Sequence, residues 1–91
     1  MGRAEACFEV VNERGLHTRA ASSLVQVASR FECEIVVATE RHSANAKSVM
    51  GVLLLCGARG TRVRVVAEGE GAEEALEAIG RLFAERFGEE H

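Results

Sequence analysis

The chain has 91 residues, 47% of them hydrophobic, with a formal net charge of −3 and an estimated pI of 5.6. This length predicts one domain over residues 1–91, whose small core must form between two stacked layers. Nucleic-acid binding is not expected, because the chain is acidic and its only aromatic residues are four Phe, without clustered basic residues or stacking platforms.

The first half of the chain alternates between strand and helix patterns. Residues 4–11 alternate apolar and polar side chains, which predicts a half-buried strand. The segment NERG at 12–15 indicates a turn. From Thr18, apolar residues recur at steps of three and four, which predicts an amphipathic helix. Residues 33–39 are rich in β-branched side chains and predict a second strand, and residues 42–46 a short third one.

The second half adds two helices and one more strand. Ser48 opens the apolar run VMGVLLL, which predicts a short helix. Residues 61–67 alternate and predict a fourth strand. Residues 72–87 carry the clearest amphipathic pattern, and the tail after them is expected to fray. The order β-α-β-β-α-β-α predicts an α+β, open-faced two-layer sandwich, with three helices on one face of a four-stranded antiparallel sheet.

His17 stands out because it comes just before the predicted helix that starts at Thr18. A helix N-terminus exposes free backbone N–H groups and a partial positive charge, both of which favour a bound anion such as phosphate. The same field disfavours the imidazolium form of His17. It therefore favours a neutral ring with a free nitrogen lone pair, which is a usable nucleophile.

The neighbours of His17 fit this interpretation. Arg19 is placed to pair with phosphoryl oxygens as a planar fork, and Gly15 permits a sharp turn into the helix. Position alone leaves a plainer alternative open, in which His17 merely caps the helix or lies on a surface loop.

Two motifs carry a resemblance to a known family. The run NERGLHTRAA resembles the active-site segment Gly-(Leu/Ile/Met)-His-x-Arg-Pro-Ala of HPr, the histidine phosphocarrier of the bacterial phosphoenolpyruvate:sugar phosphotransferase system. The run AKSVMGVLLL resembles the second HPr motif, built around a regulatory serine. The similarity covers nearly the whole chain, and the element order predicted above is that of the family.

The resemblance implies a role for each site residue. His17 would accept a phosphoryl group on Nδ1 from enzyme I and pass it to an enzyme IIA domain, while Arg19 stabilises the group. The protein would then be a phosphocarrier in sugar transport and not an enzyme. It would need no cofactor and no metal, and it is expected to act as a monomer in the cytoplasm.

Ser48 has the residue type of a helix N-cap. The resemblance adds a regulatory role, as the target of an HPr kinase/phosphorylase. A phosphate there would place negative charge on the predicted docking face, which consists of Thr18, Val49, Met50 and Leu53. Partners that need this apolar patch would then bind less well.

Two positions near His17 depart from the family pattern, and on the predicted first helix Gln26 and Ser29 stand where some relatives have Lys. Ala20 stands where the family usually has Pro. The loop therefore lacks the fixed φ angle of proline, but the helix gains alanine, the residue with the highest helix propensity. Arg14 stands where Ser, Thr or Asn is common. A second cation there would either hold phosphate more tightly or point into solvent, and we expect the latter.

Other functions remain open from the sequence. One is a regulatory module of the same fold, in a nitrogen branch or in signalling through Ser48. Another is a small-ligand-binding α+β domain in which His17 is only a cap. Membrane insertion is not expected, since no apolar run is long enough and the N-terminus is too polar for a signal peptide. The three Cys lack disulfide or metal spacing, which favours a reducing cytoplasm.

Overall fold

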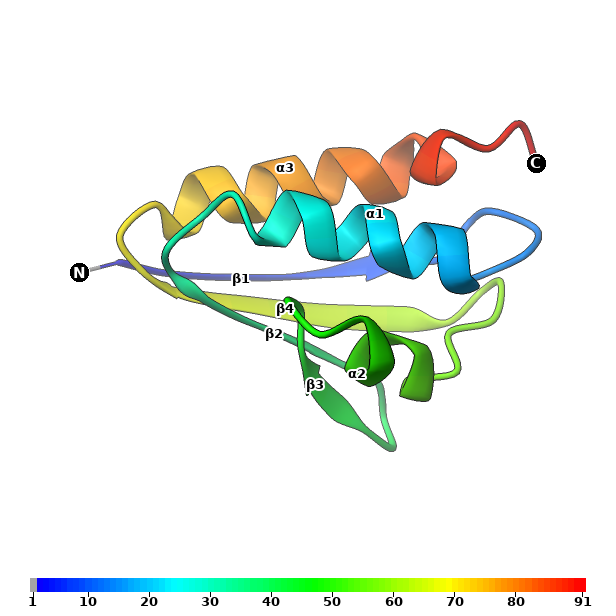
Figure 1. The fold of residues 1–91 in the computed structure, drawn as a ribbon, viewed down its shortest axis with the longest axis horizontal. Coiled ribbons are helices and arrows are strands. Elements are labelled where there is room, and N and C mark those ends of the chain that lie inside the picture. Colours follow the sequence, from blue (N-terminus) through cyan, green and yellow to red (C-terminus); the bar gives the residue numbers. More distant parts are fainter. Residues whose placement is uncertain (1) are drawn as a thin grey trace.

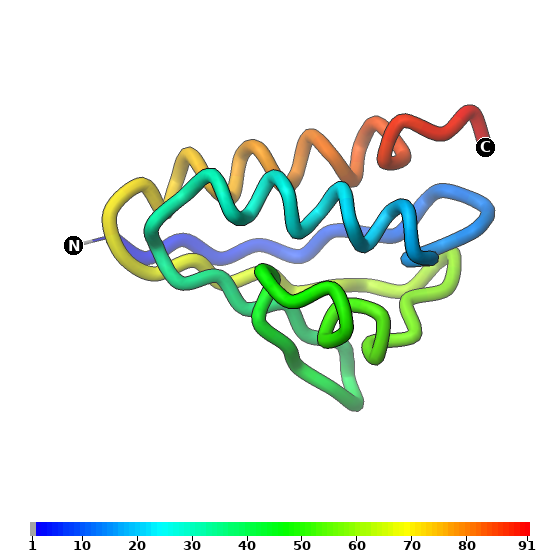
Figure 2. Tube along the Cα trace, in the orientation of Figure 1, coloured from blue at the N-terminus to red at the C-terminus, as the bar shows by residue number. Residues whose placement is uncertain are grey.

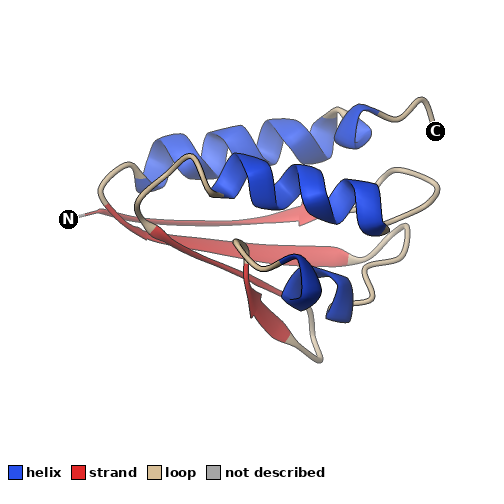
Figure 3. Cartoon of the chain, viewed as in Figure 1, coloured by secondary structure: helices blue, strands red, loops and turns tan. Residues whose placement is uncertain are grey.

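Four strands form one antiparallel sheet in the order β1-β4-β2-β3, as seen in a computed structural model that describes residues 2–91. Three helices lie together on one face of this sheet (Figure 1, Figure 3). The elements are β1 (Gly2–Glu9), α1 (Thr18–Ala28), β2 (Glu34–Ala38), β3 (Ser43–Asn45), α2 (Val49–Leu54), β4 (Arg62–Gly69), α3 (Ala72–Ala84) and the 3-10 turn η1 (Arg86–Gly88). The predicted α+β sandwich is confirmed.

The strands form where side chains alternate between the helices and solvent. In β4, Val63, Val65 and Ala67 are buried, while Arg62 and Arg64 point outward. This alternation fixes the pairing register, because a slip of one residue would turn every apolar side chain of the strand to water.

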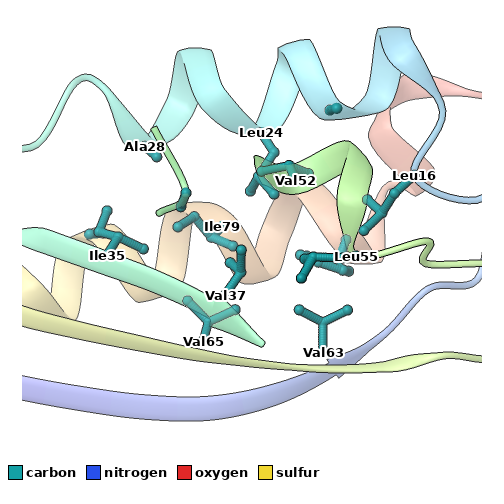
Figure 4. Close-up of a cluster of buried hydrophobic side chains, with 14 of the residues drawn as sticks. Leu16, Leu24, Ala28, Ile35, Val37, Val52, Leu55, Val63, Val65 and Ile79 are labelled. Carbon is teal, nitrogen blue, oxygen red and sulfur yellow. The ribbon is translucent and has the colours of Figure 1, made fainter. Parts of the chain in front are cut away.

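The core lies between the sheet and the helices (Figure 4). Helices α1 and α3 lie side by side over the sheet, and α2 packs against α1 and β3 (Figure 1). Aliphatic side chains fill most of this space, as expected for a chain with so few aromatic residues. Among the largest fully buried side chains are Leu24, Ile35, Val37, Val52, Ile79 and Phe83.

Helix α3 ends earlier than the sequence predicts, at Ala84 and not at residue 87. The backbone turns because Arg86 and Phe87 adopt φ values of 56° and 55°, which break the helical path. Phe87 is thereby buried, with its ring centroid 5.0 Å from that of Phe83. Burial of this aromatic ring offsets the local strain and redirects the last residues toward the start of α1.

The C-terminal tail returns to the loop that follows β1 (Figure 2). The backbone N–H of Glu13 donates a hydrogen bond to the carbonyl of His91 over 2.8 Å. The expectation of a frayed tail is therefore wrong. No helix in the described part of the chain is long and apolar enough to cross a membrane.

Candidate functional site

The loop before α1 is fastened to the loop after α2. The N–H of Leu16 donates to the carbonyl of Gly57 over 2.8 Å, and the buried Leu16 side chain (Figure 4) lies over Gly57, where a Cβ would come within 2.6 Å of its Cδ1. This anchoring holds the backbone just before His17 in a fixed position.

Gly15 is the point at which this loop turns. It adopts φ +68°, and a Cβ added there would lie 2.5 Å from the carbonyl oxygen of Gly57. A side chain at this position would be strained by the left-handed conformation and would also strike backbone. The turn into the helix therefore requires glycine, as the sequence indicated.

His17 is the N-cap residue of α1, so its predicted position at a helix start is confirmed. Its backbone is extended, and its carbonyl accepts the first intrahelical hydrogen bond, from Ala21 N over 2.8 Å. The amides of residues 18–20 precede that bond and have no partner within the helix. The imidazole makes no capping bond, so it does not fill this end of the helix itself.

The imidazole of His17 lies against a carboxylate that the sequence reasoning missed. Its Nε2 contacts Oε2 of Glu89, from the C-terminal tail. The His17 side chain is 20% exposed and that of Glu89 12%, so the ring is half-buried and less open to water than expected. The ring still lies at the molecular surface, as a transfer site requires.

Asn12 connects the carboxylate to the loop. Its Nδ2 donates to Glu89 Oε1 over 2.9 Å and to the carbonyl of Gly15 over 2.8 Å. Asn12 is fully buried, and among residues 2–91 its Oδ1 finds no hydrogen-bond partner. A buried acceptor without a hydrogen-bond partner costs about 1–3 kcal/mol, so the Oδ1 of Asn12 lowers the stability of the fold locally.

The environment of Glu89 favours its ionised form. Burial raises the pKa of the Glu89 carboxyl. Hydrogen bonds from Asn12 and His17, together with the charges of His17 and Arg14, lower that pKa by more than burial raises it. The net pKa lies below the ordinary value for Glu. The carboxyl is therefore an anion at neutral pH, able only to accept hydrogen bonds.

Two guanidinium groups lie near this pair. Arg14 and Arg19 line a surface hollow of about 430 Å³ that Glu89 also lines. Both arginines are exposed, which agrees with the prediction for Arg14, and neither forms an ion pair within the described residues. Glu13 and Glu90 line the same hollow, so the two guanidinium groups share it with carboxylates but form no direct ion pair with them.

Ser48 and the predicted docking face lie on α2. The Oγ of Ser48 accepts a hydrogen bond from Gly51 N over 3.1 Å, so the predicted N-cap is confirmed. Met50 is 69% exposed, whereas Val49 and Leu53 are half-buried. Leu54, which the sequence reasoning did not single out, is 65% exposed and enlarges the patch. Thr18 is exposed at the start of α1.

Of the predicted transfer residues, the structure places His17 and Arg19 at one end of α1. It adds Asn12 and Glu89, for which the sequence held little signal, because an Asn in a turn and a Glu in a tail are ordinary surface residues. The residues from 2 to 91 contain no cluster of three or more His, Cys, Asp or Glu side chains that could hold a metal ion.

An imidazole at an uncapped helix N-terminus, with Arg14 and Arg19 exposed nearby in the chain, suits the binding of an anionic group. Comparisons with known proteins define the class further. Residues 4–85 match the protein-family model described as "PTS HPr component phosphorylation site". The phosphocarrier protein HPr of Xylella fastidiosa (strain Temecula1) is 43% identical over 81 residues, which cover 89% of this chain and 91% of that protein.

A solved structure and a larger protein agree with this match. The structure of HPr-C-His from Thermoanaerobacter tengcongensis superimposes with a TM-score of 0.92 at 41% identity, covering 97% of this chain and 99% of that one. A multiphosphoryl transfer protein of Haemophilus influenzae is 36% identical over 97% of this chain and 18% of its own length. The chain belongs to the HPr family of phosphocarrier proteins of the phosphotransferase system.

Proposed function

We propose that this protein accepts a phosphoryl group on Nδ1 of His17 from enzyme I and passes it to an enzyme IIA domain. The observation that carries the proposal is that His17 begins α1 with only its Nε2 engaged, by Glu89. The other ring nitrogen remains for bond formation, next to amides that favour an anion.

The chemistry follows from this arrangement. A lone pair on Nδ1 attacks phosphorus, the new P–N bond forms, and the P–N bond to the donor histidine breaks. The amides of residues 18–20 and the guanidinium of Arg19 would then balance the charge on the phosphoryl oxygens. Transfer to the next histidine is the same exchange in reverse, with the His17 ring as leaving group.

Docking would use the apolar surface of α2 beside the start of α1. Met50 forms its most exposed part, with Val49 and Leu53 below it and Thr18 at the adjoining end of α1. An exposed apolar patch of this kind suits a transient protein partner, which would bring a donor or acceptor histidine to His17.

Ser48 supports a second role at the same surface. Its hydroxyl lies at the N-terminus of α2, where a phosphate is electrostatically compatible with the helix. Phosphorylation of Ser48 by an HPr kinase/phosphorylase would add negative charge beside Met50 and weaken docking. The protein would then act in regulation, in place of sugar uptake or in addition to it.

The proposal is tested by incubating the protein with a bacterial enzyme I and phosphoenolpyruvate. The buffer should match the cytoplasm, where we expect the protein to act. Intact-mass spectrometry should show one acid-labile, alkali-stable phosphoryl group on the wild type and none on His17→Ala. Equal labelling of the two proteins would contradict the proposal, as would an unlabelled wild type.

A further inference from the structure

The tail that carries Glu89 is held at several points. The N–H of Glu89 donates to the carbonyl of Arg86 over 2.9 Å, and the carbonyl of His91 accepts from Glu13 N over 2.8 Å. Phe87, just before it, is buried against Phe83. The carboxylate is therefore presented to His17 by an anchored segment.

The two oxygens of Glu89 have different partners. Oε1 accepts from Nδ2 of the buried Asn12, and Oε2 faces Nε2 of His17. Asn12 is in turn fixed by its bond to the carbonyl of Gly15, in the turn that leads to His17. Loop, carboxylate and imidazole thus form one connected unit, in which moving any member disturbs the others.

This geometry determines which ring nitrogen carries a proton. An ionised carboxylate only accepts hydrogen bonds, so the nitrogen facing it must donate. Nε2 of His17 therefore carries hydrogen, and whenever the ring is neutral its lone pair is on Nδ1. A histidine free in solution has no partner that fixes its tautomer or its ring orientation in this way.

We propose that Glu89 is a positioning residue for phosphoryl transfer, holding the His17 ring by Nε2–H so that Nδ1 faces the phosphoryl group. This inference rests on the proposed phosphocarrier function. When Nδ1 forms its bond to phosphorus, the ring gains positive charge, which the Glu89 carboxylate balances from the opposite side. The proton stays on Nε2 throughout, and the P–N bond of the donor breaks as the new one forms.

The charges around the pair are compatible with this role. Arg14 and Arg19 line the same hollow as Glu89, together with Glu13 and Glu90, so the carboxylate lies in a hollow that carries charges of both signs. The carboxylate contacts Nε2, the nitrogen away from the new bond, and is therefore placed to support the ring without competing for Nδ1.

The test compares wild type, Glu89→Gln and a matched control, Glu90→Gln, which removes the neighbouring exposed carboxylate. Glutamine keeps the size and a hydrogen-bond acceptor but removes the charge. With enzyme I and phosphoenolpyruvate, Glu89→Gln should lower kcat by about tenfold, as loss of an orienting partner of a functional histidine does at metal sites. The KM of enzyme I for this protein should stay unchanged, because Glu89 is not part of the predicted docking face, and Glu90→Gln should behave as wild type.

A second readout separates positioning from a merely structural role. In wild type, NMR of labelled histidine should show a downfield His17 Nε2–H proton protected from exchange with water. In Glu89→Gln, whose neutral amide is a weaker acceptor, that signal should move upfield and exchange faster with water. Equal or faster transfer by Glu89→Gln overturns the inference, and so does slower transfer with the signal unchanged. Failure of the proposed phosphocarrier function would look different from failure of this inference. In that case enzyme I would phosphorylate His17→Ala, or it would not phosphorylate the wild type.

Discussion

The N-termini of α1 and α2 differ in how their free backbone amides are satisfied. At α2, the Ser48 hydroxyl satisfies the amide of Gly51 and closes the helix end. At α1, His17 leaves the first amides of the helix free and turns its ring to Glu89 instead. One end is capped by a side chain, and the other has no side-chain cap.

The difference shows how a small protein separates stability from chemistry. An uncapped helix end forgoes about 1 kcal/mol, but its amides and partial charge remain available to a ligand. The cost at α1 is offset nearby, where Leu16 is buried and its amide is bonded to Gly57. The site is therefore held by the loop before the helix and not by a cap.

The largest expected effect on stability comes from breaking that loop. Gly15→Ala should lower the free energy of unfolding by about 3 kcal/mol, because a left-handed φ and a collision with Gly57 add together. Gly60→Ala is the matched control. It also has positive φ, but a Cβ there meets nothing within 4 Å, so it should lose only about 1 kcal/mol. Urea denaturation measures both, and equal losses would contradict the collision.

A smaller effect, dependent on pH, is expected at Glu89. Glu89→Gln should lower the free energy of unfolding by about 1.5 kcal/mol at neutral pH, the lower range for hydrogen bonds to a charged group. The pKa of the Glu89 carboxyl is lowered on folding, so its stabilisation is present in full above about pH 5 and is lost as pH falls through the folded-state pKa. Urea denaturation at neutral and at acid pH should therefore show the gap between the variant and wild type closing in acid. A gap that widens in acid would refute this sign.

The capped helix end should respond to loss of its hydroxyl. Ser48→Ala should cost about 1 kcal/mol, whereas Ser48→Thr, which retains an N-cap acceptor, should cost less. Thermal denaturation followed by circular dichroism measures both. Identical melting of the alanine variant and wild type would show that the hydrogen bond to Gly51 contributes nothing.

Adding a negative charge at Ser48 should have the smallest effect on stability of the changes considered. Its effect on phosphoryl transfer should be larger. Ser48→Asp should change the free energy of unfolding by less than about 0.5 kcal/mol, because Asp is also a good cap and suits the helix dipole. Phosphorylation of His17 by enzyme I should nevertheless slow, since the charge lies beside the exposed Met50. Transfer rates equal to wild type would rule out this surface as the docking face.

The sequence predicted what depends on local pattern. Alternation identified the strands, and the position of His17 before an amphipathic stretch identified the open helix end. The residues that hold the ring were not predictable in this way. The contact of His17 with Glu89 joins residues 72 positions apart, and it depends on the turn at Arg86 and Phe87. That turn forms because Phe87 packs on Phe83, and such tertiary packing leaves no periodic signal in the chain.

The central claim is tested most directly by locating phosphorus on the phosphorylated protein. Correlated proton and nitrogen NMR of the His17 ring, recorded after treatment with enzyme I and phosphoenolpyruvate, identifies the nitrogen that is bonded to phosphorus. The phosphoryl group should be on Nδ1, with Nε2 still carrying its proton against Glu89. A phosphoryl group on Nε2, or on any residue other than His17, would contradict the account.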